Sequence, residues 1–256
     1  MASSQFKIVA HGGAGSRNDH SDGAKRAVAS GLAVMEKGKS ALEAVVCAVT
    51  VLEEDGRFNA GIGSQRRSDG SIQMDASCMD STGQFGAVTA LEGFRNPVRI
   101  ACKVLESPFN LLAGKGAERF AFDNKFRSWS GKGHIAKEET SSDTVGAVAF
   151  DGKIFAAGLS TGGTSGSLKG RVGDVPLLGC GLYAGSEGAV AATGHGESIT
   201  LSLTAYRVYQ MLEMGTEPKI ALKTGLYWFD DETDIGLILV SSKGTAGGSN
   251  RSMAWA

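Results

Sequence analysis

Residues 141–163, SSDTVGAVAFDGKIFAAGLSTGG, constrain the fold of this chain more than any other stretch. Two apolar runs of small and β-branched residues, 145–150 and 154–159, flank the dipeptide Asp151-Gly152. Runs of this length on either side of an Asp-Gly turn are typical of neighbouring antiparallel strands in a buried hairpin. The sequence therefore predicts a hairpin of two core strands at this point.

Thr144 is the residue at which the polar part of this stretch changes into the first apolar run. If the bond between Asp143 and Thr144 is cut, Thr144 carries both a hydroxyl and a free α-amine. An α-amine has a pKa of about 7.7–8.0, against about 10.4 for lysine, so it is suited to take the hydroxyl proton near neutral pH. The alternative is that Thr144 is simply a β-branched residue that begins a strand.

Composition limits the classes of protein to which the chain can belong. Its 256 residues suffice for one large domain or two small ones, and a net charge of −1 gives no basic surface for nucleic acid or an anionic membrane. No apolar run is long enough to span a bilayer, and residues 1–5 lack the features of a secretion signal. The four cysteines stand singly, which predicts free thiols and a cytoplasmic location: Cys47, Cys78, Cys102 and Cys180.

The spacing of apolar residues predicts blocks of strands and blocks of helices rather than a one-by-one alternation. Strands are expected over residues 6–10, 72–79, 86–91, 189–192, 235–240 and 251–255, and helices over 22–37, 41–54, 97–105, 113–124, 197–214 and 218–227. Ser40 and Glu43 have the spacing of a capping box. Such segregation indicates an α+β fold in which helices cover mainly antiparallel sheets.

Residues 125–143 break this pattern. The segment 131–143, GKGHIAKEETSSD, contains one large aliphatic residue and many charged ones. A segment of this composition buries too little apolar surface to fold, so an exposed, cleavable linker is expected before Thr144.

Seven short motifs resemble one known family in their order along the chain. They are HGGAG (11–15), FNAGIGS (58–64), MDA (74–76), TVGAVAFD (144–151), STGG (160–163), GRVGD (170–174) and TGHGE (193–197). Together they resemble the plant-type L-asparaginases or isoaspartyl peptidases, which are N-terminal-nucleophile hydrolases with a threonine nucleophile. The resemblance covers nearly the whole chain.

The resemblance implies a fold and a processing event. The fold is a single N-terminal-nucleophile hydrolase domain over residues 1–256, a four-layer αββα sandwich in which helices flank two packed, mainly antiparallel sheets. Self-cleavage between Asp143 and Thr144 would yield an α chain, 1–143, and a β chain, 144–256. A homodimer of precursors or of α/β pairs is also implied.

The resemblance also assigns roles to individual residues. Thr144 would be the nucleophile, with Thr161 as a second threonine near it and Asn59 facing it. Thr193 and Gly194 would form the oxyanion hole, and the substrate would be bound by Arg171, Asp174, Thr193, Gly194 and Gly196. No cofactor is implied for catalysis, but a structural sodium ion is implied at the main-chain carbonyls of Leu52, Glu53, Phe58, Ala60 and Ile62.

The types of these residues suit the roles on chemical grounds, although each has a plainer explanation. Arg171 offers a planar fork for an α-carboxylate and Asp174 an anion for an α-ammonium, but the two could instead form a surface ion pair. A hydroxyl and a backbone N–H at Thr193 and Gly194 could hold an oxyanion, or the pair could only end a strand. Thr161 could be an ordinary strand residue. We interpret His195 as structural, because the α-amine already serves as the base.

The sequence therefore predicts a self-cleaving threonine amidohydrolase that acts on L-asparagine, on β-aspartyl dipeptides or on both. Asp143 stands where many members of the resembled family have glycine, whereas glycosylasparaginases and taspase have aspartate. Glycosylasparagine hydrolysis or taspase-like proteolysis is thus the alternative within the enzymes. From a different class, the chain could be an inactive relative or a ligand-binding scaffold that binds nucleotides through its glycine-rich loops.

Overall fold

The computed structural model describes residues 6–130 and 144–256. The predicted linker 131–143, and with it Asp143 of the expected cleavage site, lies outside the described residues. In chain order the elements are β1 (Lys7–Ala14), η1 (Asn18–His20), α1 (Ser21–Glu36), α2 (Ala41–Glu53), η2 (Gly61–Gly63), β2 (Met74–Asp80), β3 (Phe85–Leu91), α3 (Pro97–Val104), β4 (Leu111–Ala113), α4 (Gly114–Asp123), β5 (Val145–Phe150), β6 (Phe155–Thr161), β7 (Leu182–Gly185), β8 (Gly188–Gly194), α5 (Gly196–Leu201), α6 (Thr204–Glu213), α7 (Pro218–Leu226), β9 (Ile235–Ser241), β10 (Gly244–Ser249) and β11 (Met253–Trp255).

The described strands form two sheets that are mainly antiparallel, in agreement with the predicted α+β class. The larger has the order β11-β1-β5-β6-β2-β3-β4 and the smaller the order β10-β9-β8-β7. Every neighbouring pair in them is antiparallel except the parallel pair of β3 with β4. The predicted hairpin is confirmed as β5 and β6, which lie inside the larger sheet between β1 and β2.

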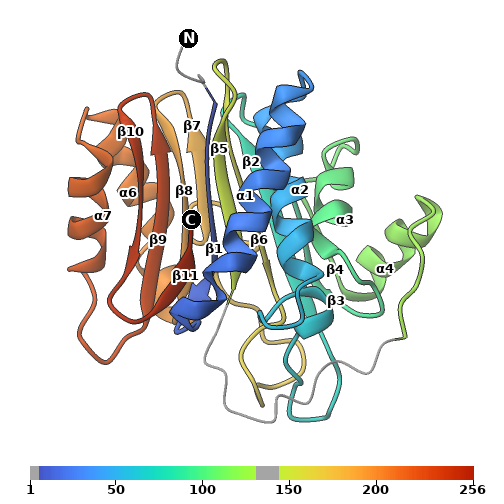
Figure 1. The fold of residues 1–256 in the computed structure, drawn as a ribbon. Coiled ribbons are helices and arrows are strands. Elements are labelled where there is room, and N and C mark those ends of the chain that lie inside the picture. Colours follow the sequence, from blue (N-terminus) through green and yellow to red (C-terminus); the bar gives the residue numbers. More distant parts are fainter. Residues whose placement is uncertain (1–5, 131–143) are drawn as a thin grey trace.

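Apolar side chains of the described residues gather in three clusters that join these elements. One lies between the sheets and includes Val148 and Leu159 of the larger sheet and Leu182 and Ile238 of the smaller. A second joins α1, α2 and α3 to the larger sheet, and a third joins α6 and α7 to the smaller sheet. Figure 1 shows the result, with α6 and α7 on one side of the molecule, both sheets in the middle, and α1, α2 and α3 on the other side.

Asp151 fixes the hairpin connection and ties it to a helix. The connection spans residues 151–154, longer than the predicted Asp-Gly turn, because Phe150 pairs with Phe155. One carboxylate oxygen of Asp151 accepts hydrogen bonds of 2.9 Å from the backbone N–H groups of Lys153 and Ile154. The other accepts one of 2.8 Å from Ala41 N–H at the start of α2. The turn and the helix N-terminus are therefore stabilised by the same side chain.

The predicted helix over 197–214 is wrong, because the chain forms two helices there. α5 ends at Leu201 and α6 begins at Thr204, and between them Leu203 has a left-handed φ of 47°. The apolar spacing continues through this break, so periodicity alone does not reveal it. The capping box of Ser40 and Glu43 is confirmed at the start of α2.

The described start of the expected linker is attached to the domain. Trp129 N–H donates a 2.7 Å hydrogen bond to Gly93 O, and Phe126 packs against the core under α3.

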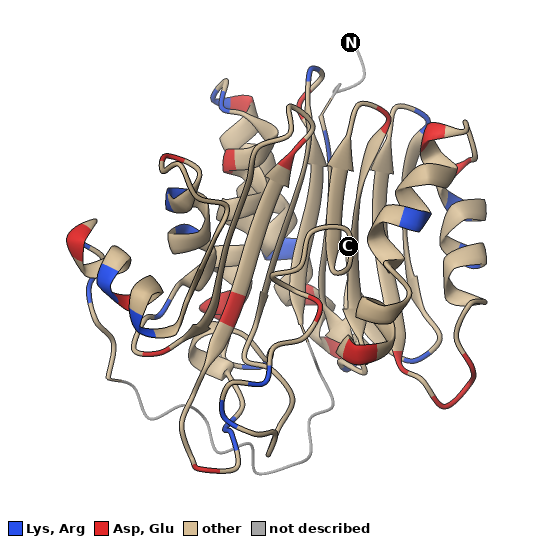
Figure 2. Ribbon diagram, turned by 180° about the vertical axis from the view of Figure 1, so that it is seen from behind, with Lys and Arg blue, Asp and Glu red and all other residues tan. Residues whose placement is uncertain are grey.

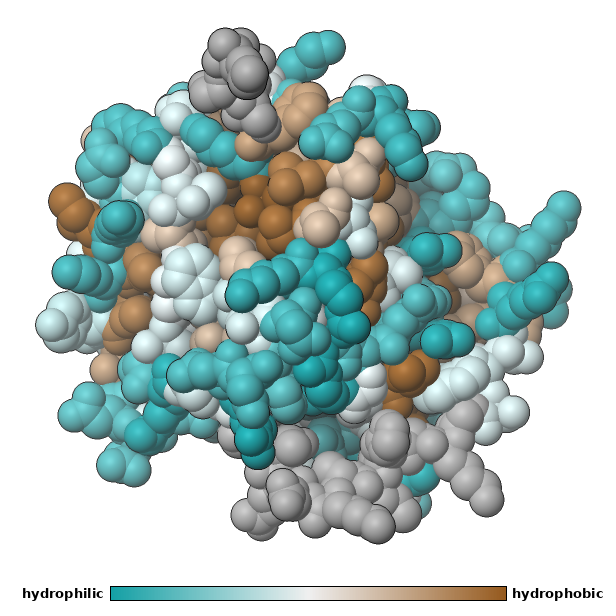
Figure 3. All heavy atoms as spheres, viewed as in Figure 1, coloured by the Kyte–Doolittle hydropathy of each residue, from teal (hydrophilic) through white to brown (hydrophobic). Residues whose placement is uncertain are grey.

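In Figure 2 most charged residues lie on helices and connecting loops, while the strands are largely uncharged. The face drawn in Figure 3 is correspondingly rich in hydrophilic side chains. Within the two described ranges, every helix is too short or too polar to cross a membrane.

Candidate active site

Thr144 lies at the end of a central strand, next to the second predicted threonine. It directly precedes β5 and is 3% exposed. Val145 pairs with Ser160 across β5 and β6, so the same register continued by one residue sets Thr144 opposite Thr161. Directly opposed residues of antiparallel strands have Cβ atoms about 4.5–5.5 Å apart. The strand register therefore brings the two threonines together.

A small pocket brings most of the predicted site residues together, although they come from distant parts of the sequence. Its free volume, about 10 Å³, corresponds to a single water molecule. The predicted residues that line it are Thr144, Thr161, Arg171, Asp174, Gly194 and Gly196, and they are joined by Gly163, Thr164 and Gly173.

Asn59 supports the pocket wall rather than lining it. Its side-chain amide donates a 2.8 Å hydrogen bond to Gly163 O, and its carbonyl oxygen accepts one of 3.1 Å from Gln65 N–H. Gly162 N–H also donates to the backbone carbonyl of Asn59, at 3.1 Å. Asn59 therefore connects the glycine-rich loop before β2 to the loop that follows Thr161.

Thr193 is oriented by the first strand of the chain. It lies in β8, is fully buried, and is not among the lining residues of the pocket, although its neighbour Gly194 is. Its Oγ1 accepts a 3.1 Å hydrogen bond from Ala14 N–H. A hydroxyl that accepts in this way still has its own proton to donate. The sequence did not reveal this role of Ala14, because the bond joins residues 179 positions apart.

Arg171 forms an ion pair with Glu197, and the charge of Asp174 also acts on it. The guanidinium is bidentate, with Nε 2.9 Å from Oε1 of Glu197 and Nη2 2.7 Å from Oε2. This contact holds the pKa of Glu197 below its usual range. An ion pair of Arg171 and Asp174 at the surface does not describe this arrangement, because Asp174 is buried and Arg171 is engaged by Glu197. No role was assigned to Glu197 from the sequence, although this charged residue ends the TGHGE motif, directly after Gly196.

Gly196 allows the two charged side chains to approach each other. A Cβ on Gly196 would lie 2.8 Å from Nη2 of Arg171 and 3.0 Å from Oδ1 of Asp174. Asp174 itself is only 4% exposed. A cation and an anion thus both lie next to Gly196 in the pocket wall.

His11 is a buried neutral base beside the site that sequence reasoning missed. Its Nδ1 accepts a 3.1 Å hydrogen bond from Gly13 N–H, which leaves the ring proton on Nε2. Burial lowers its pKa to about 3, although a hydrogen bond with the Thr144 backbone acts in the opposite direction. His195, by contrast, is exposed and caps α5 through Ser198, in agreement with a structural role.

Acid is expected to destabilise the fold through His11. The unfolded histidine binds a proton below about pH 6.5 while the folded one does so near pH 3, so the free energy of unfolding falls as pH falls through this window. Between pH 7.5 and pH 4.5 the contribution of His11 is about 3 kcal/mol. Urea unfolding at both pH values would measure it, and His11→Asn should reduce the difference while the exposed-site control His195→Asn should not. An equal pH effect in the two variants contradicts the assignment.

In the loop expected to bind sodium, two backbone carbonyl groups lie close to glycines, Glu53 O to Gly61 and Phe58 O to Gly63. Glu53 O lies 2.3 Å from the position of a Cβ on Gly61, whose φ of 52° is left-handed. The carbonyls of Phe58 and Ala60 accept backbone hydrogen bonds within the same loop. Among the described residues no cluster of three His, Cys, Asp or Glu side chains could hold a metal, so an ion here would depend on carbonyl oxygens.

Comparison with known proteins identifies the family of this chain. The chain matches the model of the asparaginase family over residues 4–138 and 123–256, and it therefore belongs to the asparaginase family. It is 38% identical to the isoaspartyl peptidase/L-asparaginase of Rattus norvegicus, over 97% of this chain and 85% of that protein. It is 35% identical to the plant-type L-asparaginase of Pyrococcus abyssi, over 94% of this chain and 91% of that protein.

Proposed function

We propose that this chain is a self-cleaving threonine amidohydrolase that releases aspartate from L-asparagine and from β-aspartyl dipeptides. The observation that carries the proposal is the convergence of Thr144, Arg171 and Asp174 on one pocket. The names of the rat and archaeal relatives, isoaspartyl peptidase/L-asparaginase and plant-type L-asparaginase, support the two kinds of substrate.

Maturation would use the Thr144 hydroxyl on its own chain. Oγ attacks the carbonyl carbon of Asp143, the peptide C–N bond breaks, and the acyl group passes from nitrogen to oxygen. Water then hydrolyses the ester, which leaves a carboxylate on Asp143 and a free hydroxyl and α-amine on Thr144. The products are an α chain, 1–143, and a β chain, 144–256. Because Thr144 lies at the head of a buried strand, its attacking oxygen stays in place when the bond is cut.

Hydrolysis of the substrate would repeat this chemistry on a side-chain amide. The α-amine of Thr144 accepts the proton of Oγ, which attacks the amide carbon and forms a tetrahedral intermediate. The Thr193 hydroxyl and Gly194 N–H stabilise its oxyanion. The Thr144 ammonium returns the proton to the leaving nitrogen, so ammonia or an amino acid departs. Water then hydrolyses the β-aspartyl ester, aspartate leaves, and Oγ regains its proton.

The headgroup of the substrate would be bound by opposite charges. Glu197 occupies Nε and Nη2 of Arg171, and the described residues give no partner to Nη1, which can donate to the α-carboxylate. Asp174 would accept from the α-ammonium. The free volume of the pocket corresponds to about one water molecule, so we expect side chains in its wall to shift when the substrate binds.

The finer features of the family are proposed on the same basis. The two sheets and their covering helices would constitute the four-layer αββα sandwich of an N-terminal-nucleophile hydrolase. The active form would be a homodimer, and sedimentation as a monomer at the concentration used in the activity assay would contradict this.

The carbonyl groups at Leu52, Glu53, Phe58, Ala60 and Ile62 would hold a structural sodium ion. An unfolding midpoint that is the same in sodium chloride and in choline chloride would exclude this ion.

Denaturing mass spectrometry of the purified protein, combined with assays of released product, tests the proposed function. We expect two polypeptides with the masses of residues 1–143 and 144–256, ammonia from L-asparagine, and a free amino acid from a β-aspartyl dipeptide. Cleavage of glycosylasparagine without release of ammonia from L-asparagine would assign the glycosylasparaginase alternative. A full-length chain without activity would identify an inactive relative.

A further inference from the structure

A second hollow lies beside the start of α3 and shares no lining residue with the pocket at Thr144. It is a groove of about 350 Å³, within the usual range of about 300–1,000 Å³ for small-molecule sites. We call it the arginine groove. Its polar and aromatic walls are formed by Arg95, Asn96, Arg99, Arg127 and Trp129, and its apolar walls by Phe94, Ile100 and Phe126.

The arginine groove carries more positive charge than its surroundings neutralise. Arg127 is exposed and makes no ion pair or hydrogen bond within the described residues. Nε of Arg95 is 3.9 Å from Glu54 Oε1, which is the outer limit for an ion pair. Nε of Arg99 donates to Thr50 Oγ1 at 3.2 Å, so its two terminal nitrogens remain available. No acidic residue is among the described residues that line the groove.

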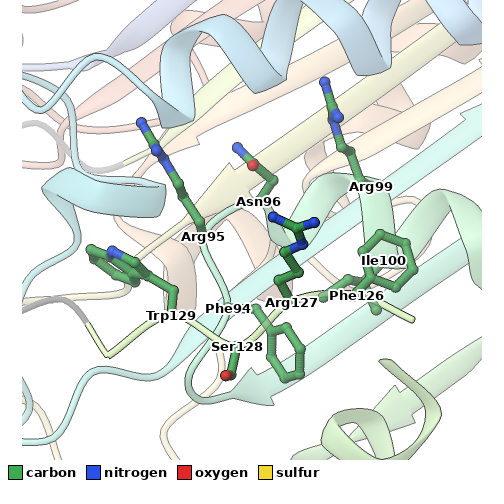
Figure 4. A pocket seen from close by; sticks show the side chains of 9 residues that line it. All are labelled: Phe94, Arg95, Asn96, Arg99, Ile100, Phe126, Arg127, Ser128 and Trp129. Carbon is green, nitrogen blue, oxygen red and sulfur yellow. The ribbon is translucent and has the colours of Figure 1, made fainter. Parts of the chain in front are cut away.

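Three arginine side chains line the groove, with Arg127 between Arg95 and Arg99 in Figure 4, and the walls that carry them are held in place. The segment 126–129 is attached to the domain by the 2.7 Å hydrogen bond from Trp129 N–H to Gly93 O. On the opposite wall, the Asn96 amide donates to Glu53 Oε2 at 3.2 Å, directly before Pro97 begins α3. Several guanidinium groups on one groove raise the positive potential there and so favour an anionic ligand.

We propose that the arginine groove binds a phosphate monoester carried on a flat ring, as in a mononucleotide. Guanidinium groups match the geometry of phosphate oxygens with paired N–H donors, and a groove lined by arginines without an acidic residue favours a dianion. Trp129 is half-buried beside them, and an indole face of this kind stacks on a nucleobase. The groove thus has the two parts that such a ligand requires, charged at one side and aromatic at the other.

Isothermal titration of the whole purified protein with adenosine 5′-monophosphate tests the proposal. We expect this nucleotide to bind at least about tenfold more tightly than adenosine or inorganic phosphate, because each of those engages only one part of the groove. Binding should weaken with added salt and should be unchanged by saturating aspartate, which would occupy the Arg171 pocket instead. No binding of the nucleotide at millimolar concentration, or competition by aspartate, overturns the proposal.

Substitutions in the arginine groove separate charge from stacking. Arg127→Gln should lower the affinity for the nucleotide about tenfold and leave the unfolding midpoint nearly unchanged, since Arg127 is exposed and makes no ion pair or hydrogen bond within the described residues. Trp129→Leu should weaken binding of the nucleotide but not of inorganic phosphate. Arg119→Gln is the matched control, because Arg119 is exposed on α4 and pairs with Asp123 outside the groove. Equal affinities in all three variants and the unmodified protein contradict the site, whether or not the amidohydrolase activity is found.

Discussion

Thr144→Ala is expected to yield a single uncut polypeptide of 256 residues with amide hydrolysis reduced by about 10⁴–10⁶. The variant lacks the attacking oxygen for both reactions, and without cleavage it also lacks the α-amine that serves as the base. Denaturing mass spectrometry and ammonia release from L-asparagine measure the two effects in one preparation.

The matched variant Thr144→Ser separates the hydroxyl from the rest of the side chain. Serine keeps the oxygen and, after cleavage, the α-amine, but it loses the methyl group that restricts χ1. We therefore expect a cleaved protein with reduced but measurable activity. A cleaved Thr144→Ala protein, or an uncut one that still hydrolyses L-asparagine at the normal rate, contradicts the mechanism.

The central part of the fold could be predicted from the sequence because its signals are local. The runs on either side of Asp151-Gly152 specify β5 and β6, and Ser40 with Glu43 specifies the start of α2. The strands that the sequence missed are β4, β7 and β10, which are short or rich in glycine. β10 reads GTAGGS and becomes a strand because it pairs with the strongly apolar β9. The conformation of β10 depends on its pairing with β9, and the residues of β10 alone do not indicate this pairing.

Some features of the candidate site could likewise be predicted from short motifs, whereas others depend on contacts between residues far apart in the sequence. Motifs identified the residues that line the pocket, and the register of β5 with β6 explains why Thr144 and Thr161 meet. The role of Ala14 could not be read from the sequence, because it consists of a hydrogen bond to Thr193, 179 positions away. The TGHGE motif contains Glu197, but it does not indicate the partner, Arg171, with which Glu197 pairs. The assignment of roles to Arg171 and Thr193 came from the family resemblance, since each residue type has a plainer explanation by itself.

Thr193→Val is expected to lower kcat by about 10²–10³ and to change KM little. Valine keeps the shape of the threonine side chain but removes the hydroxyl that would donate to the oxyanion, which forms only in the transition state. The same substitution leaves Ala14 N–H buried without its acceptor, so it should also lower the free energy of unfolding by about 1–3 kcal/mol. Steady-state kinetics on L-asparagine and urea unfolding measure the two consequences separately.

Thr204→Val distinguishes the loss of an oxyanion donor from simple destabilisation. Thr204 is also fully buried, and its Oγ1 donates a 3.2 Å hydrogen bond to Ile199 O, but neither of its chain neighbours lines the pocket, whereas Gly194 beside Thr193 does. A stability loss of the same order with normal kcat is therefore expected for Thr204→Val, while Thr193→Ser should restore much of the rate by returning the hydroxyl. If Thr193→Val keeps the normal kcat, the oxyanion is stabilised by other groups and the Ala14–Thr193 bond serves only the packing of the two sheets.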